Sequence, residues 1–239
     1  MSGLKAIDPI DRQETLGGMA HRSLRSALMA GNFRPGEKIT IRAVAAVLNV
    51  SMTPAREALF NLVAEGILEL DQNRTVRIPA LTPERVAEIT AIRLSLEKLA
   101  TEAATAIIDD ETVDRIEAFH NELVVHFAAK DYTAMIEANW KVHFTLYEAA
   151  GMPTLLKMIE SLWLTVGSYL VTIYPDFATP ADGLPHHEKL IGALRTRNAS
   201  VAAEAIATDI QFSAEALTRA VAHHEEQRLD GTFPISRKP

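Results

Sequence analysis

The sequence contains no cysteine, few aromatic residues and no long apolar run. Without cysteine the chain can form neither a disulfide framework nor a thiolate metal site, and nothing in it requires an oxidising compartment. No stretch reaches the ~18 consecutive apolar residues of a membrane-spanning helix, and residues 1–9 lack the apolar region of a secretory signal. We therefore expect a soluble, cytoplasmic protein without a membrane partner.

The sequence is long enough for two domains, and its charge is unevenly distributed. Its 239 residues, 48% of them apolar, are enough for two domains with buried cores. The formal net charge is −7, yet residues 1–80 carry 10 lysines and arginines against 8 acidic residues, whereas residues 81–239 carry 14 against 23. The acidic character therefore belongs to the second part of the chain, and the first part is slightly basic.

Residues 41–64 have the pattern of two helices joined by a tight turn. Apolar positions recur at helical spacing in two sets, Ile41, Val44, Ala45 and Leu48, then Ala55, Ala58, Leu59, Leu62 and Val63. Ser51 or Thr53 can cap the second helix, and Pro54 fits its first turn. Met52, Thr53 and Arg56 lie opposite the apolar positions, at the end that a recognition helix presents to DNA. Arg56 is the best candidate for a base or phosphate contact.

A short hairpin is predicted after these helices. Residues 67–70 and 76–78 form two short apolar strands around a turn at residues 71–74. The hairpin would carry Arg74 and Arg77 outward, where arginines suit phosphate or minor-groove contact. Any three-helix core shows apolar stripes, so the hairpin is what favours a winged helix-turn-helix that binds double-stranded DNA. Because the local positive charge is small, we expect two copies, a homodimer, to act together at a palindromic site.

A helical domain is predicted after a short linker, residues 80–83, in which Thr82 and Pro83 fit an N-cap and a first helical residue. From residue 84 to residue 224 every long segment has helical period and no strand pattern interrupts it. The sequence thus predicts a mainly α fold. An extension of residues 1–15 precedes a winged helix-turn-helix domain at residues 16–79, and an all-α antiparallel bundle of roughly six helices occupies residues 84–224. Residues 225–239 are predicted to form a flexible tail.

Four side chains of this bundle have a spacing that suits a metal ion. Asn139 and His143 are four residues apart, so they share one face of a helix. His187 and Asp209 are 22 residues apart, with a turn at Asn198 midway, so two antiparallel helices would bring them to the same height. Imidazole, carboxylate and amide oxygen form a donor set for a divalent ion of the Zn, Ni or Mn class. Lone histidines on helices are more often surface or core residues, and that interpretation stays open.

The first part of the chain resembles the GntR family of bacterial transcription regulators. The match covers residues 24–78 and includes the Pro35-Gly36 pair, the two helices, residues 62–70 and the turn of the hairpin. The resemblance implies DNA contacts at positions of the helix-turn-helix and wing. The predicted DNA-binding residues are Arg42, Ser51, Met52, Thr53, Arg56, Asn73 and Arg74.

Two positions depart from the family pattern. Met52 stands where many members have an arginine that reads a guanine, and Thr75 stands where the wing usually has a glycine. Loss of a bidentate arginine–guanine contact removes about 1–3 kcal/mol of discrimination at that base. The resemblance therefore implies DNA binding but leaves the operator sequence open.

The helices from Thr82 onward resemble the FCD ligand-binding domain of the FadR-type branch of this family. The matching segments begin at Arg93, Asn139 and His187. Many members of that branch bind a divalent metal through an Asp or Asn, a His four residues later and two further histidines. Here Asp209 stands where the last histidine is usual, so the resemblance implies a metal site with a more oxygen-rich shell. A metal-free site, in which His143 and His187 contact an anionic effector directly, is the alternative.

Effectors of the family are commonly carboxylic acids, so the resemblance implies a regulator, more specifically a repressor, whose operator binding changes with a small carboxylate. The candidate effector-binding residues are Arg93, Trp140, Trp163 and Tyr169, although each is also a common packing residue. A metal-dependent enzyme is an alternative, but no general base or nucleophile motif accompanies the ligands. An architectural DNA-binding protein without an effector is a further alternative. We predict that the protein is not an enzyme.

Overall fold

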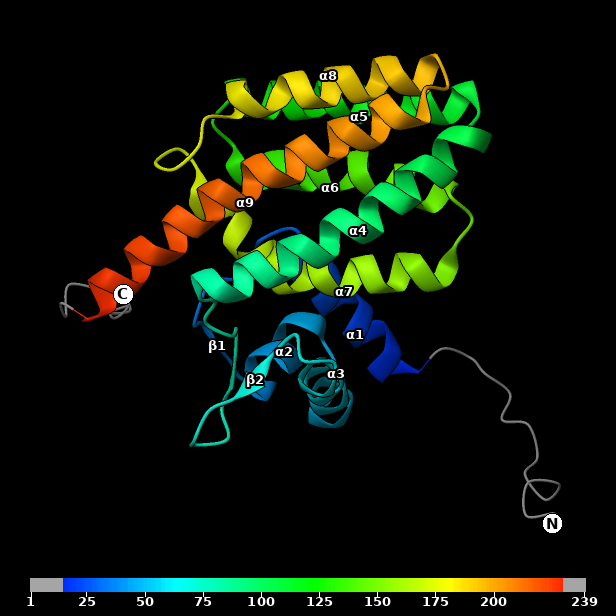
Figure 1. Ribbon diagram of the computed structural model, residues 1–239. Coiled ribbons are helices and arrows are strands. Elements are labelled where there is room, and N and C mark those ends of the chain that lie inside the picture. The colour runs from blue at the N-terminus through cyan, green and yellow to red at the C-terminus, as the bar shows by residue number, and fades with distance from the viewer. Residues whose placement is uncertain (1–14, 230–239) are drawn as a thin grey trace, which may run out of the picture. The chain divides into compact units, whose positions relative to one another are not determined.

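The computed structural model describes residues 15–229, and its fold is mainly α, as predicted (Figure 1). Contacts within the chain divide it into two compact units. Among the described residues, one unit holds residues 15–26 together with Lys38–Arg77, and the other holds Ala27–Glu37 together with residues 78–229. Among the described residues, no helix combines the length and apolarity needed to cross a membrane.

The first unit has the elements of a winged helix-turn-helix. They follow in the order α1 (Leu16–Met29, whose last turn belongs to the other unit), β1 (Lys38–Ile39), α2 (Ile41–Leu48), α3 (Met52–Ala64), β2 (Glu69–Leu70) and β3 (Val76–Arg77). The three strands are antiparallel in the order β1-β3-β2. Thr40 caps α2 by accepting a hydrogen bond from the Ala43 amide, and Asn49 adopts a left-handed conformation (φ 52°) that turns the chain toward α3. Leu59 and Leu62 of α3 are fully buried and centre the core.

The wing is held by one carboxylate. Asp71 accepts hydrogen bonds from the amides of Asn73 and Thr75 and from Nε of Arg77, all at 2.8 Å. These bonds, the Thr75 amide first, lower the pKa of Asp71 to about 2. The prediction that Arg77 points outward is therefore wrong, because its side chain is half-buried against Asp71. Arg74 is exposed at the tip in a left-handed conformation (φ 57°).

The second unit is a helical bundle. Its elements are α4 (Pro83–Ile107), α5 (Asp110–Ala128), α6 (Tyr132–Ala149), α7 (Pro153–Leu170), the short 3-10 helix η2 (Val171–Ile173), α8 (Pro180–Arg195) and α9 (Ala199–Leu229). The main packing pairs are α4 with α9, α5 with α6 and α8 with α9 (Figure 1). Asp109 and Asp131 cap α5 and α6. Helix α9 continues through Leu229, so residues 225–229 are helical, although the tail was expected to begin at residue 225; residues 1–14 and 230–239 lie outside the described residues.

Helix α7 and η2 hold both segments through which the second unit connects to the first. The Tyr169 hydroxyl accepts a hydrogen bond from the Leu81 amide at 2.8 Å and donates one to the Pro79 carbonyl at 3.0 Å. The other segment, Ala27–Glu37, packs so closely that a Cβ on Gly167 would lie 2.8 Å from the carbonyl oxygen of Leu28. Glycine at this position is therefore what allows the backbones to approach.

Candidate functional site

Three of the four predicted metal ligands meet in the interior of the helical unit. His143 of α6, His187 of α8 and Asp209 of α9 each offer a ligand atom within 4.8 Å of the others. Nε2 of His143 lies 3.3 Å from Oδ2 of Asp209, and Nε2 of His187 lies 3.7 Å from Oδ1. All three residues are buried. His187 and Asp209, 22 residues apart in sequence, thus lie side by side in space, as their spacing predicted.

Local sequence explains how α8 and α9 return to the same height. Arg197 adopts a left-handed conformation (φ 55°), and the side-chain oxygen of Asn198 accepts a hydrogen bond from the Val201 amide, so α9 begins directly after the turn. Arg195 contacts Asp114 and Glu117 of α5, which ties the end of α8 to its neighbour. The turn and these contacts therefore fix where α9 begins relative to the end of α8.

Asn139, the fourth predicted ligand, lies one helical turn before His143 on α6. It lines a cavity that His187 and Asp209 also line. This cavity is about 40 Å³ in volume, which exceeds the ~10–15 Å³ that one water needs. Its walls are polar and apolar in nearly equal parts, and its polar lining comes mainly from Arg93, Asn139, His187, Asp209 and Ser213. The cavity therefore combines three of the four candidate metal ligands, Asn139, His187 and Asp209, with a guanidinium group.

The structure separates the four predicted effector-binding residues into two pairs. Arg93 and Trp163 line the cavity, and the Arg93 guanidinium lies 4.5 Å from the centre of the Trp163 ring. Trp140 instead stacks on Phe144, with ring centres 5.2 Å apart, and the Tyr169 hydroxyl bonds the segment 79–81. The expectation that Trp140 and Tyr169 line the cavity is therefore not met, because helix periodicity did not show which way these rings turn.

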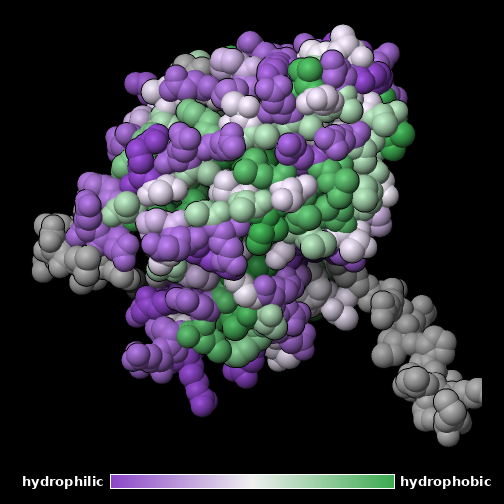
Figure 2. All heavy atoms as spheres, in the orientation of Figure 1, coloured by the Kyte–Doolittle hydropathy of each residue, from purple (hydrophilic) through white to green (hydrophobic). Residues whose placement is uncertain are grey.

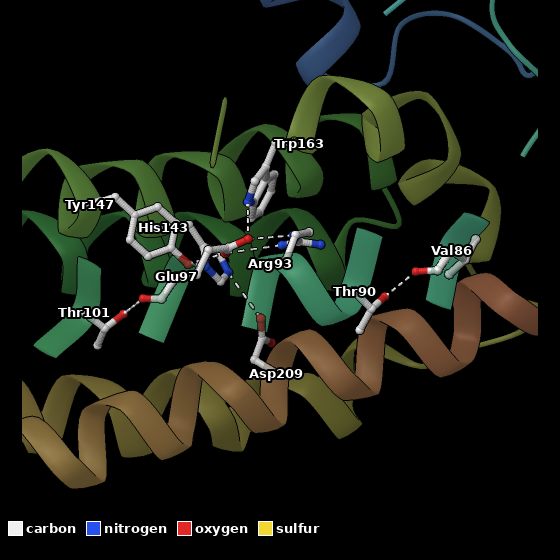
Figure 3. A network of polar contacts seen from close by, with 9 residues as sticks. All are labelled: Val86, Thr90, Arg93, Glu97, Thr101, His143, Tyr147, Trp163 and Asp209. Carbon is white, nitrogen blue, oxygen red and sulfur yellow. Dashed lines mark hydrogen bonds and ion pairs between the residues drawn. The ribbon is translucent and has the colours of Figure 1, made fainter. Parts of the chain in front are cut away.

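A buried polar network lies directly behind the candidate ligands, and the sequence did not indicate it (Figure 3). Glu97 of α4 is fully buried and accepts hydrogen bonds from Nε of Arg93 at 2.6 Å, the Tyr147 hydroxyl at 2.5 Å and Nε1 of Trp163 at 3.1 Å. The Tyr147 oxygen also lies 3.0 Å from Nδ1 of His143. Two i, i+4 pairs, Arg93 with Glu97 and His143 with Tyr147, were the available signal, but such pairs are common on helices.

Electrostatics keep His187 and Asp209 in the forms that bind cations. Burial lowers the pKa of His187 to about 4, so its imidazole is neutral near pH 7. Burial would raise the pKa of Asp209, but the facing imidazoles of His143 and His187 and the nearby Arg93 hold it at about 2. His120 of α5 also approaches this cluster, with its ring centre 5.5 Å from that of His187, and burial lowers its pKa.

This donor set fits a divalent cation. Neutral imidazoles and an ionised carboxylate are the ligand forms that metals require. His143 Nε2 is buried and makes no hydrogen bond within the described part of the chain, although it points at the Asp209 carboxylate. A buried nitrogen lone pair beside a carboxylate oxygen is unfavourable alone and favourable around a cation.

The predicted DNA-binding residues lie on the first unit. Arg42 of α2 is exposed, as are Ser51, Met52, Thr53 and Arg56 at the start of α3. Ser51 occupies the N-cap position but its side chain makes no capping hydrogen bond, so the α3 amides at this end are not blocked by it. Asn73 and Arg74 are exposed at the wing tip. The structure therefore leaves these seven side chains accessible to a partner.

Comparison with known families gives two matches. The FCD domain model matches residues 88–212, more than half of the chain, and the model for bacterial regulatory proteins of the gntR family matches residues 16–78. The first match covers the polar network and the candidate metal ligands, and the second covers the predicted DNA-binding residues.

Known proteins agree with these matches over most of the chain. The chain is 28% identical to the HTH-type transcriptional regulator McbR of Escherichia coli over 73% of this chain and 80% of that protein. It is 26% identical to the uncharacterized regulator YdhC of Bacillus subtilis (86% and 92%), and 21% identical to the repressor RspR of Escherichia coli (90% and 91%). The solved structure of Escherichia coli McbR/YncC has a TM-score of 0.81 at 23% identity, with coverage of 87% and 99%, which supports the same fold.

Proposed function

Because this chain belongs to the gntR family of bacterial regulatory proteins and carries an FCD domain, it is a transcriptional regulator rather than an enzyme, and we propose that it is a repressor controlled by a small carboxylate. The proposal is that a homodimer binds a palindromic operator and that a metal-assisted site in the helical unit receives the effector. The observation that carries it is the buried cluster of His143, His187 and Asp209 beside a cavity that also contains Arg93.

The metal is proposed to bind through His143, His187, Asp209 and Asn139. Two nitrogen and two oxygen donors suit a divalent ion of the Zn, Ni or Mn class and leave coordination positions for water or a ligand. When bound, such an ion would supply a positive centre that holds a carboxylate. The metal-free alternative has the two histidines contact the effector directly.

Arg93 is proposed as the second anchor for the effector. Its hydrogen bonds to Glu97 use Nε and Nη2 and not Nη1, and its side chain lines the cavity. A guanidinium is a strong hydrogen-bond donor to a carboxylate, and a bound metal ion would offset the negative charge of Asp209 in the same cavity. The cavity is small, so a ligand larger than a few heavy atoms would require the surrounding helices to move.

The homodimer is supported by charge and by an exposed apolar face. The first unit has only a small positive excess, so one copy would bind DNA weakly. Ile92 and Leu99 are 40% and 47% exposed and stand two turns apart on one face of α4. Figure 2 shows apolar residues gathered over α4 and α7. A second copy of the chain would cover such a patch.

Helix α7 is proposed to transmit the state of the cavity to the chain connections. It contributes Trp163 to the cavity wall, and its next two turns carry Gly167 and Tyr169, which hold the Leu28 backbone and the segment 79–81. A ligand shifts operator affinity only if it favours one arrangement of this helix over another. A change in the position of α7 would therefore move the Leu28 backbone and the segment 79–81 together.

We expect Arg56→Ala to weaken operator binding by about 1–3 kcal/mol, because the variant loses a base or phosphate contact at the start of α3. The measurement is fluorescence anisotropy with an operator obtained by genomic selection, at fixed salt. Arg115→Ala, which removes an equal charge from an exposed site on α5, is the matched control. Equal binding by Arg56→Ala and the control would contradict the proposed recognition helix.

We expect Tyr169→Phe to reduce the effect of added Mn²⁺ or Zn²⁺ on operator affinity, since the ring stays while both hydrogen bonds to the segment 79–81 are lost. Allosteric couplings are typically about 5- to 150-fold, and the ratio for this variant should move toward one. Tyr132→Phe, the same chemical change on α6, is the control. If Tyr169→Phe bound metal and responded to it as the wild type does, the proposed transmission route would be wrong.

A further inference from the structure

We infer that Tyr147, held by Glu97, fixes the tautomer of His143 and thereby makes Nε2 the nitrogen that faces the cation. Tyr147 would be a positioning residue, since it contacts the ligand and not the ion. This inference rests on the proposed metal site for its consequence, but the tautomer itself is a property of the protein alone.

The argument begins with the single hydroxyl hydrogen of Tyr147. Glu97 is paired with Arg93 and presents acceptor oxygens, so the Tyr147 hydroxyl donates to Glu97 Oε2 at 2.5 Å. The Tyr147 oxygen then has only lone pairs to offer to Nδ1 of His143, which lies 3.0 Å away. Nδ1 must therefore carry the hydrogen that completes this contact.

The tautomer has a direct consequence at the other end of the imidazole. With the hydrogen on Nδ1, a neutral His143 presents a lone pair at Nε2. Nε2 lies 3.3 Å from Oδ2 of Asp209, which is also an acceptor, and makes no hydrogen bond within the described residues. Two acceptors held together in a buried site need a proton or a metal ion between them, so Nε2 is the nitrogen at which a metal ion would replace the proton.

A packing role for Tyr147 would give a different result. Its side chain is 1% exposed and contacts the His143 ring, so a phenylalanine would fill nearly the same space. If only the ring mattered, loss of the hydroxyl would leave His143 unchanged. In our inference, Tyr147→Phe removes the one acceptor that residues 15–229 offer to the Nδ1 hydrogen, and the hydrogen is then better placed on Nε2, where Asp209 accepts it.

The test combines histidine NMR with metal titration. Long-range ¹⁵N–¹H spectra of ¹⁵N-histidine-labelled, chelator-treated protein report the tautomer of His143, assigned with His143→Gln. We expect the neutral imidazole of His143 to carry its hydrogen on Nδ1 in the wild type and on Nε2 in Tyr147→Phe. Zn²⁺ affinity, measured by competition with a chromophoric chelator, should fall about 10- to 100-fold in Tyr147→Phe, as is typical when a partner of a metal ligand is lost. Tyr132→Phe should leave both readouts unchanged.

The outcomes separate this inference from the proposed function. An Nε2–H tautomer in the wild type, or unchanged Zn²⁺ affinity in a folded Tyr147→Phe, would overturn the inference even if the wild type binds metal. If the wild type bound no Zn²⁺ but showed the Nδ1–H form, the tautomer inference would stand and the metal part of the proposed function would fall. Should Tyr147→Phe not fold, the wild-type spectrum alone decides.

Discussion

Glu97→Gln is expected to lower the free energy of unfolding by about 3–5 kcal/mol, because it leaves the buried Arg93 cation without its counter-ion. Both residues of this pair are buried, at 6% exposure for Arg93 and 0% for Glu97. Glu97 also accepts from Tyr147 and Trp163, so one carboxylate satisfies donors from three helices (Figure 3). Removing its charge weakens all of these hydrogen bonds together.

The control for this prediction is the double variant Arg93→Met/Glu97→Leu. Replacing a buried ion pair by apolar side chains of similar size is often neutral or stabilising, so the double variant should recover much of the lost stability. Urea denaturation at one fixed protein concentration measures the change, because the stability of a dimer depends on concentration. An unchanged midpoint in Glu97→Gln would show that the pair is not an electrostatic requirement of the fold.

The second large effect is expected at Asp209. Asp209→Ala removes the carboxylate nearest to both candidate histidine ligands, and we expect the purified variant to retain no stoichiometric divalent metal after reconstitution and dialysis. The reason is chemical: Asp209 supplies the one formal negative charge among the four proposed donors. Elemental analysis of untagged protein gives the metal content, with operator binding as a check that the winged unit remains intact.

Asp209→His distinguishes the metal site from its alternative. This change restores the histidine that is usual in the FCD branch that the sequence resembles, and it replaces an oxygen donor by a softer nitrogen donor. We expect the variant to keep a metal and to favour Zn²⁺ or Ni²⁺ over Mn²⁺ more than the wild type does. If wild type, Asp209→Ala and Asp209→His all bound no metal, direct contact between the two histidines and the effector would be the better account.

Much of the site could be predicted because helices have a fixed rise and period. The spacing of Asn139 and His143 gave one face of α6, and the 22 residues between His187 and Asp209 gave a common height on two antiparallel helices. The helical period could not show which aromatic side chains point into the cavity. Trp140 and Tyr169 have helical spacing compatible with a cavity, yet one stacks on Phe144 and the other bonds the segment 79–81.

The roles of Glu97 and Tyr147 escaped prediction for a related reason. Their importance comes from contacts between α4 and α6, 50 positions apart in sequence, and long-range contacts leave no period in the chain. Arg77 is a smaller example, because its bond to Asp71 depends on how the wing turn closes. In each case a polar side chain pairs with another polar group that a turn or helix packing brings to it.

The sequence by itself determined the mainly α fold, the helix-turn-helix with its wing, the family, and the four positions proposed as metal ligands. The fold and the placement of the ligand positions follow from local period, capping and spacing, and the family follows from the resemblance of the quoted motifs. Only the tertiary structure decided that Glu97 joins Arg93, Tyr147 and Trp163 behind those positions, and that α7 holds the segment 79–81. The physical reason is that a buried polar group must find its partner wherever packing brings one, and packing joins residues that the sequence keeps far apart.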